Sequence, residues 1–221
     1  FELVVSSIDA KEIIITNDLV VEKAQQNIVR YDKNGEQHYD IISAFIKSIR
    51  GSDPNAAVYW LARMIEGGED VKFIARRLIV LASEDIGNAN PTALVIANNC
   101  FQAINIIGLP EARITLSQAV IYLACSTKSN SAYMAINEAQ EEVRNSGNLS
   151  VPLHLRNAST KLMKELGYGK EYQYSHNKPM DTQEFLPTEI SKNPFYKPSN
   201  NTKENTYREK LKILWREKYN Y

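Results

Sequence analysis

The residue types that most often carry catalysis or bind metals are sparse in this chain and lie far apart. The three histidines are His38, His154 and His176, and none shows the i, i+4 pairing of a helical zinc site. A surface or helix-capping role is therefore the better interpretation of each histidine. The two cysteines, Cys100 and Cys125, stand in apolar segments, which is typical of inert core thiols.

Motifs for nucleophilic catalysis and nucleotide binding are also missing. No Gly-x-Ser-x-Gly elbow occurs, so nothing supports a hydrolase nucleophile. The string 167–170, Gly-Tyr-Gly-Lys, is similar to part of a phosphate loop, but a Walker A motif needs glycine where Lys164 stands and serine or threonine where Glu171 stands. Glu84 and Asp85 are adjacent, and adjacent helical residues do not face each other, so they make a poor acid–base pair. A stand-alone enzyme is the function class with the least support.

Composition excludes several further classes of protein. The chain has 221 residues, of which 43% are hydrophobic and 24% charged, values typical of one globular domain or two small ones. Its 26 Lys and Arg residues equal its 26 Asp and Glu residues, which argues against a wholly basic nucleic-acid binder. No apolar run approaches the roughly 18 residues that a membrane span needs, and no membrane partner is expected. The chain begins at Phe1 rather than Met, and we expect it to be a piece of a longer protein.

The charge is unevenly distributed along the chain. Residues 1–150 hold 13 Lys and Arg against 18 Asp and Glu, whereas residues 151–221 hold 13 against 8 and carry seven of the 12 tyrosines. A basic segment rich in tyrosine can bind phosphates and stack on bases. The same composition is typical of a loop-rich arm that packs its tyrosines on a helical body, and we favour this second interpretation.

Glycine and proline divide the chain into helical segments. Six glycines each close an apolar periodic segment, as expected of helix C-termini: Gly51, Gly67, Gly87, Gly108, Gly147 and Gly167. The pairs Asp53-Pro54 and Asn90-Pro91 are helix-start signals. Apolar stripes of helical period run through residues 41–49, 58–65, 71–81 and 116–123, and further helices are expected over 159–166 and 206–218. The sequence therefore predicts an all-α helical bundle.

Two of the expected helices are apolar on more than one face. Residues 93–107 and 114–125 carry large aliphatic side chains off their main stripes. A helix that is apolar all round is either central in its domain or buried against another subunit, and both interpretations stay open. The candidate subunit contacts are Phe101, Ile104, Ile107, Ile121 and Tyr122.

Three strings together resemble the C-terminal part of the replication-associated recombination protein A family, AAA+ ATPases related to clamp loaders. The strings run over residues 39–64, 73–91 and 151–170, and the second contains Ala-Ser-Glu-Asp-Ile-Gly-Asn-Ala-Asn-Pro. The resemblance covers about residues 28–200. Ser159 stands where the family usually has proline, and Asn177 stands where it usually has aspartate.

The resemblance implies an organisation for the chain. Residues 1–27 would be the remnant of an AAA+ lid domain, and residues 28–167 would be the helical oligomerisation domain, similar to the clamp-loader collar. Residues 168–221 would form the basic, Tyr-rich arm packed on the bundle. The resemblance implies a homotetramer.

The resemblance also implies a function for the intact protein. It would be a cytoplasmic, nucleoid-associated, DNA-dependent ATPase that acts at stalled replication forks in replication, recombination and repair, with single-stranded-DNA-binding protein as a partner. ATP and Mg²⁺ would be bound by a preceding N-terminal module. For the present chain we expect no cofactor, no metal and no catalytic residue.

An alternative role for the chain is DNA binding by its basic residues. The candidate contacts to DNA or another anionic partner are Arg50, Arg76, Arg77, Arg156, Lys161 and Lys164. Lys161 and Lys164 are three residues apart and would share a helix face, and Lys and Arg contacts to phosphates would make binding sensitive to salt. The same residues would equally suit helix C-termini and salt bridges between subunits, and we favour that interpretation.

Overall fold

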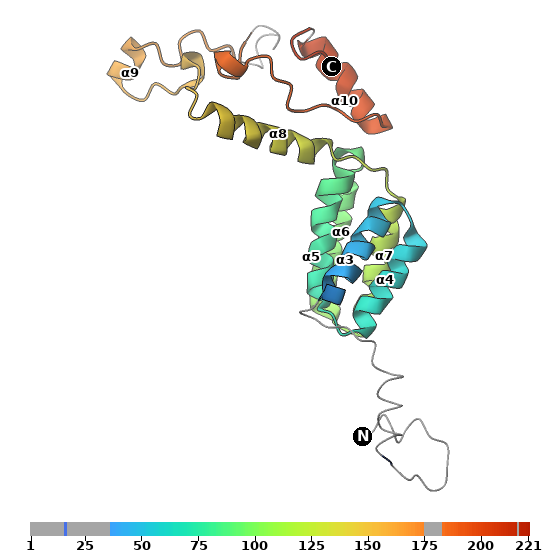
Figure 1. Cartoon of the computed structure of the whole chain (residues 1–221). Helices are drawn as coiled ribbons and strands as arrows, with labels where there is room; N and C mark the ends of the chain where they lie inside the picture. Colours follow the sequence, from blue (N-terminus) through green and yellow to red (C-terminus); the bar gives the residue numbers. More distant parts are fainter. Residues whose placement is uncertain (1–15, 17–35, 175–182, 216) are drawn as a thin grey trace. The chain divides into compact units, whose positions relative to one another are not determined.

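The computed structural model describes residue 16 and residues 36–174, 183–215 and 217–221, and the regular structure within these residues is all helical (Figure 1). The predicted all-α fold class is therefore confirmed. Over the same residues, no helix combines the length and the apolar character that crossing a membrane requires.

The chain forms two compact units. Of the described residues, those up to 81 and 95–126 belong to unit 1, and those over 82–94 and from 127 onward belong to unit 2. The boundaries between these units do not coincide with the domain boundaries predicted after residues 27 and 167. The predicted domain boundaries stay predictions. Apart from residue 16, the predicted lid remnant lies outside the described residues.

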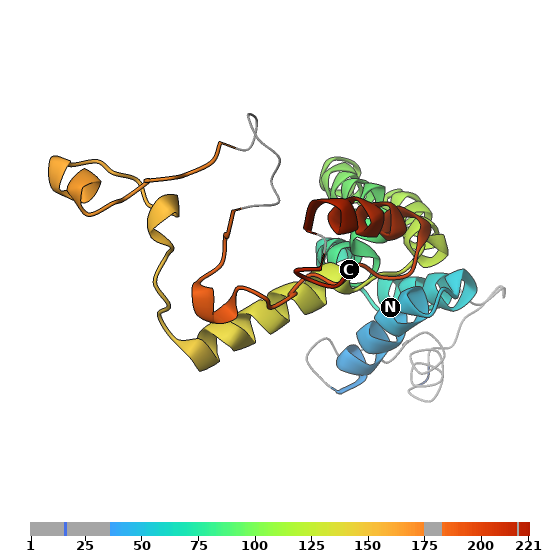
Figure 2. The ribbon, with the colours of Figure 1, turned by 90° about the horizontal axis from the view of Figure 1, so that it is seen from above.

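Unit 1 is a bundle of helices. Its elements are α3 (Glu36–Arg50), α4 (Pro54–Glu66), α5 (Val71–Leu81), most of α6 (Thr92–Ile107) and α7 (Ala112–Cys125). Helix α4 packs against both α3 and α7, and α3 and α5 each also contact α7 (Figures 1 and 2). This arrangement places α4 and α7 beside each other, which creates the groove described below.

The core of unit 1 follows the predicted apolar stripes of α3, α5 and α7 and takes a different face of α4. Phe45 of α3, Met64 of α4, Leu78 of α5 and Leu116 and Leu123 of α7 are all 0% exposed. Full burial of a side chain of this size contributes about 1.5–3 kcal/mol through its removal from water. The predicted stripes over 41–49, 71–81 and 116–123 are thus confirmed as the inward faces of α3, α5 and α7. The stripe predicted over 58–65 is wrong as an inward face, because α4 buries Ala57, Leu61 and Met64, while Val58 and Ile65 are half-buried and Ala62 is exposed.

Local capping explains where α4 begins. The Asp53 side chain accepts hydrogen bonds from the backbone N–H groups of Asn55 and Ala56, both at 3.0 Å, and Pro54 occupies the first helical position. These bonds satisfy two of the donors that a helix N-terminus leaves free. The start signal predicted at Asp53-Pro54 is confirmed.

Unit 2 combines helices with short irregular turns. Its elements are a π-turn η1 (Ala82–Ile86), the 3₁₀ turns η2 (Gly87–Ala89), η3 (Leu153–Leu155) and η5 (Thr188–Ile190), and the helices α8 (Ser131–Ser146), α9 (Lys161–Glu165) and α10 (Thr202–Trp215). For α8 the sequence predicted only the C-terminal end, at Gly147, whose φ is 68°. No apolar stripe predicted the body of this helix. Helix α10 begins and ends earlier than the predicted 206–218, because the Asn201 side chain accepts a hydrogen bond from the Glu204 N–H at 2.9 Å and starts the helix there.

The string 82–91 forms a junction with the residues that precede α8. The Ser129 N–H donates to the Asp85 carbonyl oxygen at 2.7 Å. Gly87 has a φ of 48°, and a Cβ at this position would lie 3.1 Å from the Ser129 carbonyl oxygen. Glycine is required here because the backbone is left-handed and the neighbouring chain passes close by.

A fully buried carboxylate ties α10 to this junction. Glu204 is 0% exposed and accepts hydrogen bonds from the Ser131 hydroxyl, from the Tyr196 hydroxyl at 3.0 Å and from the Asn201 amide at 2.6 Å. Burial acts to raise the pKa of Glu204, but hydrogen bonds from these groups and from Ser129 lower it below its usual value. The carboxylate is therefore held in its charged form, and no described Lys or Arg side chain pairs with it.

Candidate functional site

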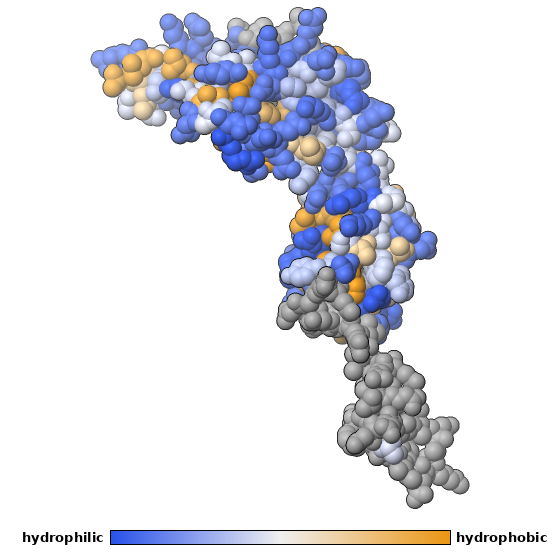
Figure 3. Space-filling view, viewed as in Figure 1, coloured by the Kyte–Doolittle hydropathy of each residue, from blue (hydrophilic) through white to orange (hydrophobic). Residues whose placement is uncertain are grey.

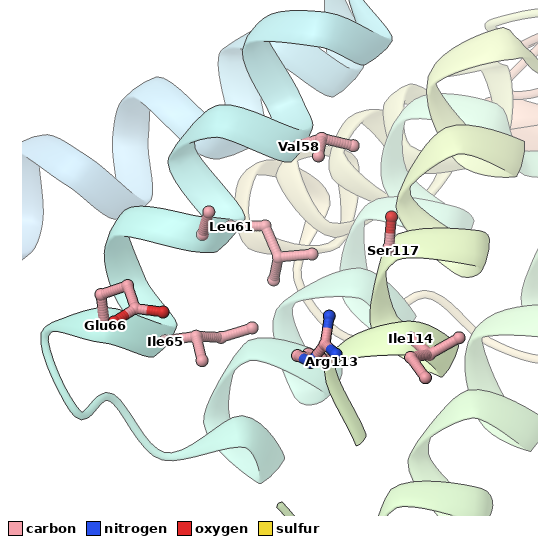
Figure 4. Close-up of a pocket in the computed structure, with 8 residues that line it drawn as sticks. Val58, Leu61, Ile65, Glu66, Arg113, Ile114 and Ser117 are labelled. Carbon is pink, nitrogen blue, oxygen red and sulfur yellow. The ribbon is translucent and has the colours of Figure 1, made fainter. Parts of the chain in front are cut away.

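A groove lies between α4 and α7 within unit 1. Its volume is about 430 Å³, and its lining residues are Val58, Leu61, Ala62, Ile65, Glu66, Arg113, Ile114 and Ser117 (Figure 4). The α4 members recur at positions i, i+3, i+4, i+7 and i+8, the spacing that puts residues on one helix face. The two helices run in opposite directions along the groove, because Glu66 ends α4 and Arg113 lies in the first turn of α7 at the same end of the groove.

The groove is apolar along most of its length. Leu61 is 2% exposed and belongs to the core, whereas Val58 and Ile65 are half-buried. Ile114 is 59% exposed, so α7 presents a large aliphatic side chain to solvent beside the groove. Concave apolar surface with exposed aliphatic side chains is typical of a site that binds another protein segment.

Two charges of opposite sign stand at one end of the groove. Glu66 and Arg113 are both exposed, and within the part of the chain that the structure describes neither side chain forms an ion pair or a hydrogen bond. Glu66 lies at a helix C-terminus and Arg113 at a helix N-terminus, so each charge opposes its own helix dipole, at a cost of about 0.3–1 kcal/mol at low ionic strength. The stability of the isolated bundle therefore does not explain these two residues.

Further apolar residues are exposed at the turn that joins α6 to α7. We call Ile106, Ile107, Leu109 and Ile114 the hairpin patch; they are 84%, 46%, 53% and 59% exposed. On the face drawn in Figure 3, apolar side chains reach the surface of the bundle among polar ones. Four exposed aliphatic side chains within nine residues exceed the single scattered residues that are normal on a surface.

The predicted subunit contacts differ in their exposure. Ile107 and Ile121 are 46% and 44% exposed, and Phe101 and Tyr122 are half-buried. Ile104 is 1% exposed and belongs to the core of its own unit, so this member of the predicted set has no surface to offer a partner. The apolar character of α6 therefore has two causes, because one side fills the bundle and the other faces solvent.

The predicted basic contacts of unit 1 lie on α3 and α5. Arg76 forms an exposed ion pair with Asp70 at 3.6 Å and lies over the Phe73 ring at 6.0 Å. Arg77 and Arg50 are exposed. An exposed pair of this kind contributes little to stability, so Arg76 stays accessible to an anionic partner.

The predicted basic contacts of unit 2 have different surroundings. The Arg156 side chain donates to the Val151 carbonyl oxygen at 2.6 Å and to the Tyr168 hydroxyl at 3.2 Å, and its guanidinium lies 5.1 Å from the Tyr168 ring centre. Arg156 therefore holds the 151–170 segment together. Lys161 and Lys164 are exposed on the single turn of α9.

His38 and His154 each have a structural partner. Cys100 is buried, as predicted for a core thiol, whereas Cys125 is exposed and the same prediction is wrong for it. His38 lies 2.8 Å from Glu69, and the His154 Nε2 lies 2.7 Å from the Glu184 carbonyl oxygen. Burial raises the pKa of Cys100 to about 11, which keeps this thiol protonated and unreactive. In the described ranges, no three or more His, Cys, Asp or Glu side chains come together in a way that could hold a metal ion. His176 lies outside the described residues.

Sequence reasoning missed the charged pair of the groove and the buried network around Glu204. The signal for the pair is the placement of an acid at the end of one helix and a base at the start of another, against both dipoles. The network joins Ser131 to a residue 73 positions later, and no local pattern marks such a contact.

Comparison with known proteins identifies relatives over most of the chain. The family described as MgsA AAA+ ATPase C terminal matches residues 51–215, and the family described as AAA C-terminal domain matches residues 1–50. The replication-associated recombination protein A of Coxiella burnetii is 44% identical over 90% of this chain and 46% of its own length. The replication-associated recombination protein A of Bacillus subtilis is 48% identical over 85% of this chain and 45% of its own length. The ATPase WRNIP1 of Dictyostelium discoideum is 40% identical over 84% of this chain and 22% of its own length. The chain thus spans less than half the length of these relatives.

Proposed function

Because the chain belongs to the MgsA AAA+ ATPase C-terminal family, we propose that it is the module that joins subunits of such an ATPase into a homotetramer. The observation that carries this proposal is the exposed apolar surface of unit 1, made of the α4–α7 groove and the hairpin patch. Burying this surface against a second copy would remove aliphatic side chains from water.

The proposed role is geometric. Joining subunits raises the effective concentration of the ATPase modules around one another and around a shared ligand. ATP and Mg²⁺ would be bound in the part of the protein that precedes this chain in its relatives, and the chain itself would supply no reacting group. The names of the relatives place them in replication-associated recombination, and we propose the same setting here, with DNA and single-stranded-DNA-binding protein as partners of the whole protein in the cytoplasm, at the nucleoid.

Light scattering across a concentration range in moderate salt tests the proposal. A mass near 100 kDa, about four times the 25.1 kDa of one chain, is the expected result. A mass that stays at 25.1 kDa up to the highest soluble concentration would contradict an oligomerisation role for this chain alone.

DNA binding is the second candidate function. Exposed Arg77, Lys161 and Lys164 favour it, because these side chains are accessible to phosphates. Titration of fluorescent single-stranded DNA at low salt tests it: binding that weakens steeply as salt rises supports DNA contact, and an unchanged signal removes this function for the chain. Arg156→Ala is a poor reporter here, since it would also loosen the 151–170 segment.

A further inference from the structure

The two walls of the α4–α7 groove are complementary to each other. Glu66 stands on the α4 wall and Arg113 on the α7 wall, both at the same end, and apolar Ile65 and Ile114 lie next to them in sequence. A surface whose two halves are complementary can bind a copy of itself, because a two-fold rotation brings each half onto the other.

From this arrangement we propose that two copies of the chain pair through the α4–α7 groove about a two-fold axis that runs along it. Such an axis lays α4 of one copy on α7 of its partner and the reverse. Glu66 then faces Arg113 of the partner subunit, and the same ion pair forms twice. The inference rests on the proposed oligomerisation, for which it names the contact and the symmetry.

The charges favour a second copy over a chemically different occupant. An acidic partner would be attracted by Arg113 and repelled by Glu66, and a basic partner would meet the reverse. A second copy presents both charges in the order that satisfies both walls. Pairing also supplies each charge with an opposite charge, which its own helix dipole does not do.

The apolar part of the groove would be covered by the same contact. The half-buried Val58 and Ile65 on α4 of one copy would meet α7 of the other copy, and the exposed Ile114 on α7 would meet α4 of the other copy. A two-fold contact makes a dimer, and a tetramer needs a second surface. Three members of the hairpin patch, Ile106 at 84%, Leu109 at 53% and Ile107 at 46% exposed, lie outside the residues that line the groove and could supply that surface.

Charge reversal tests the pairing. In Glu66→Arg, two bases face each other twice, and in Arg113→Glu two acids do so. Each single variant is expected to weaken self-association by about tenfold or more, measured by sedimentation velocity over a concentration series. An equimolar mixture of the two variants is expected to associate again, because every facing pair in the mixed dimer is once more of opposite charge. The double variant Glu66→Arg with Arg113→Glu should also recover.

Two controls separate loss of pairing from loss of folding. Lys72→Glu makes the same base-to-acid change in the first turn of α5, at an exposed residue that does not line the groove, and should leave self-association unchanged. Both groove variants place a charge in accord with its helix dipole, so their melting temperatures should stay equal or rise while association falls.

The outcomes distinguish the two proposals. If the unaltered chain is monomeric at every concentration, the proposed function fails. If the unaltered chain associates but both groove variants behave like Lys72→Glu, oligomerisation stands and this contact is wrong. If the single variants lose association and their mixture does not recover, the groove binds another segment or a non-reciprocal copy, and the two-fold pairing is overturned.

Discussion

The buried carboxylate of Glu204 provides a direct test of what holds unit 2 together. In Glu204→Ala the acceptor of three hydrogen bonds is removed, and the Asn201 amide and the Ser131 and Tyr196 hydroxyls lose their shared partner. A buried donor left unsatisfied costs about 1–3 kcal/mol. Ser131 keeps its contact with the Ser129 hydroxyl at 3.1 Å, and rotation of the hydroxyls relieves part of the loss. We expect a net loss of about 3–5 kcal/mol in the free energy of unfolding of unit 2.

Glu204→Gln should lower the free energy of unfolding by less than Glu204→Ala does, by about 1–2 kcal/mol. The glutamine oxygen can still accept from the Asn201 amide, and its NH₂ group can donate to the Ser131 and Tyr196 hydroxyls once these rotate. The order of stability is therefore wild type, then glutamine, then alanine. An assay that reports each variant is urea unfolding followed by circular dichroism and by the fluorescence of Trp215, which lies at the end of α10.

The pH dependence gives an independent readout. Because the folded-state pKa of Glu204 lies below the usual 4.5, its charged form contributes stability that is fully present above pH 4.5. That contribution is lost as the pH falls through the folded-state pKa. The stability difference between wild type and Glu204→Gln should therefore shrink as the pH drops below about 4.5.

A matched control is Glu209→Gln on the same helix, where Glu209 is exposed and forms an i, i+3 ion pair with Lys212 at 3.0 Å. This change should alter stability by less than about 0.5 kcal/mol. If Glu204→Ala costs no more than this control, the buried network does not hold unit 2 together and the reasoning fails.

Three further predictions follow from local geometry. Asp53→Ala should lower the free energy of unfolding by about 1 kcal/mol, whereas Asp53→Asn keeps the cap and should lower it less. Thermal unfolding of both variants measures this difference. Gly87→Ala should lower the free energy of unfolding by about 1–3 kcal/mol in the same measurement, because Gly87 has a φ of 48° and a backbone atom of the neighbouring segment lies close to it. The loss should be larger than for Gly108→Ala, because Gly108 has a φ of 65° but no neighbouring atom within 4 Å of an added Cβ. At pH 8 a thiol reagent should modify exposed Cys125 and leave Cys100 intact until unfolding, so mass spectrometry of the folded protein should find one adduct rather than two.

Much of unit 1 could be predicted because its signals are local. The start of α4 depends on Asp53 and Pro54, and the inward faces of α3 and α7 depend on apolar residues repeating every three or four positions. Such patterns involve residues within a few turns of one helix, so they can be recognised without knowledge of the rest of the chain. The family resemblance likewise rested on uninterrupted strings, and the match over residues 51–215 confirms it.

Unit 2 was predicted less well, since its structure depends on contacts between distant segments. The π-turn at Ala82–Ile86 carries no periodic signal, and its shape depends on the bond from Ser129 to Asp85. The early start of α10 follows from a local cap, in which the Asn201 side chain accepts from the Glu204 N–H, whereas the position of the buried Glu204 carboxylate depends on Ser131 of another helix. Local propensity is a weak guide where tertiary contacts supply most of the stabilisation.

The amino-acid sequence alone determined the fold class, the main helix positions of unit 1, the family and the absence of recognisable catalytic motifs, because each of these is written in neighbouring residues. The packing of the helices against one another sets which apolar side chains are core and which are surface. Ile104 and Ile107 stand three positions apart on one helix, yet they are 1% and 46% exposed. It also decided that Glu66 and Arg113 share one groove, since residues 47 positions apart meet only when two helices pack.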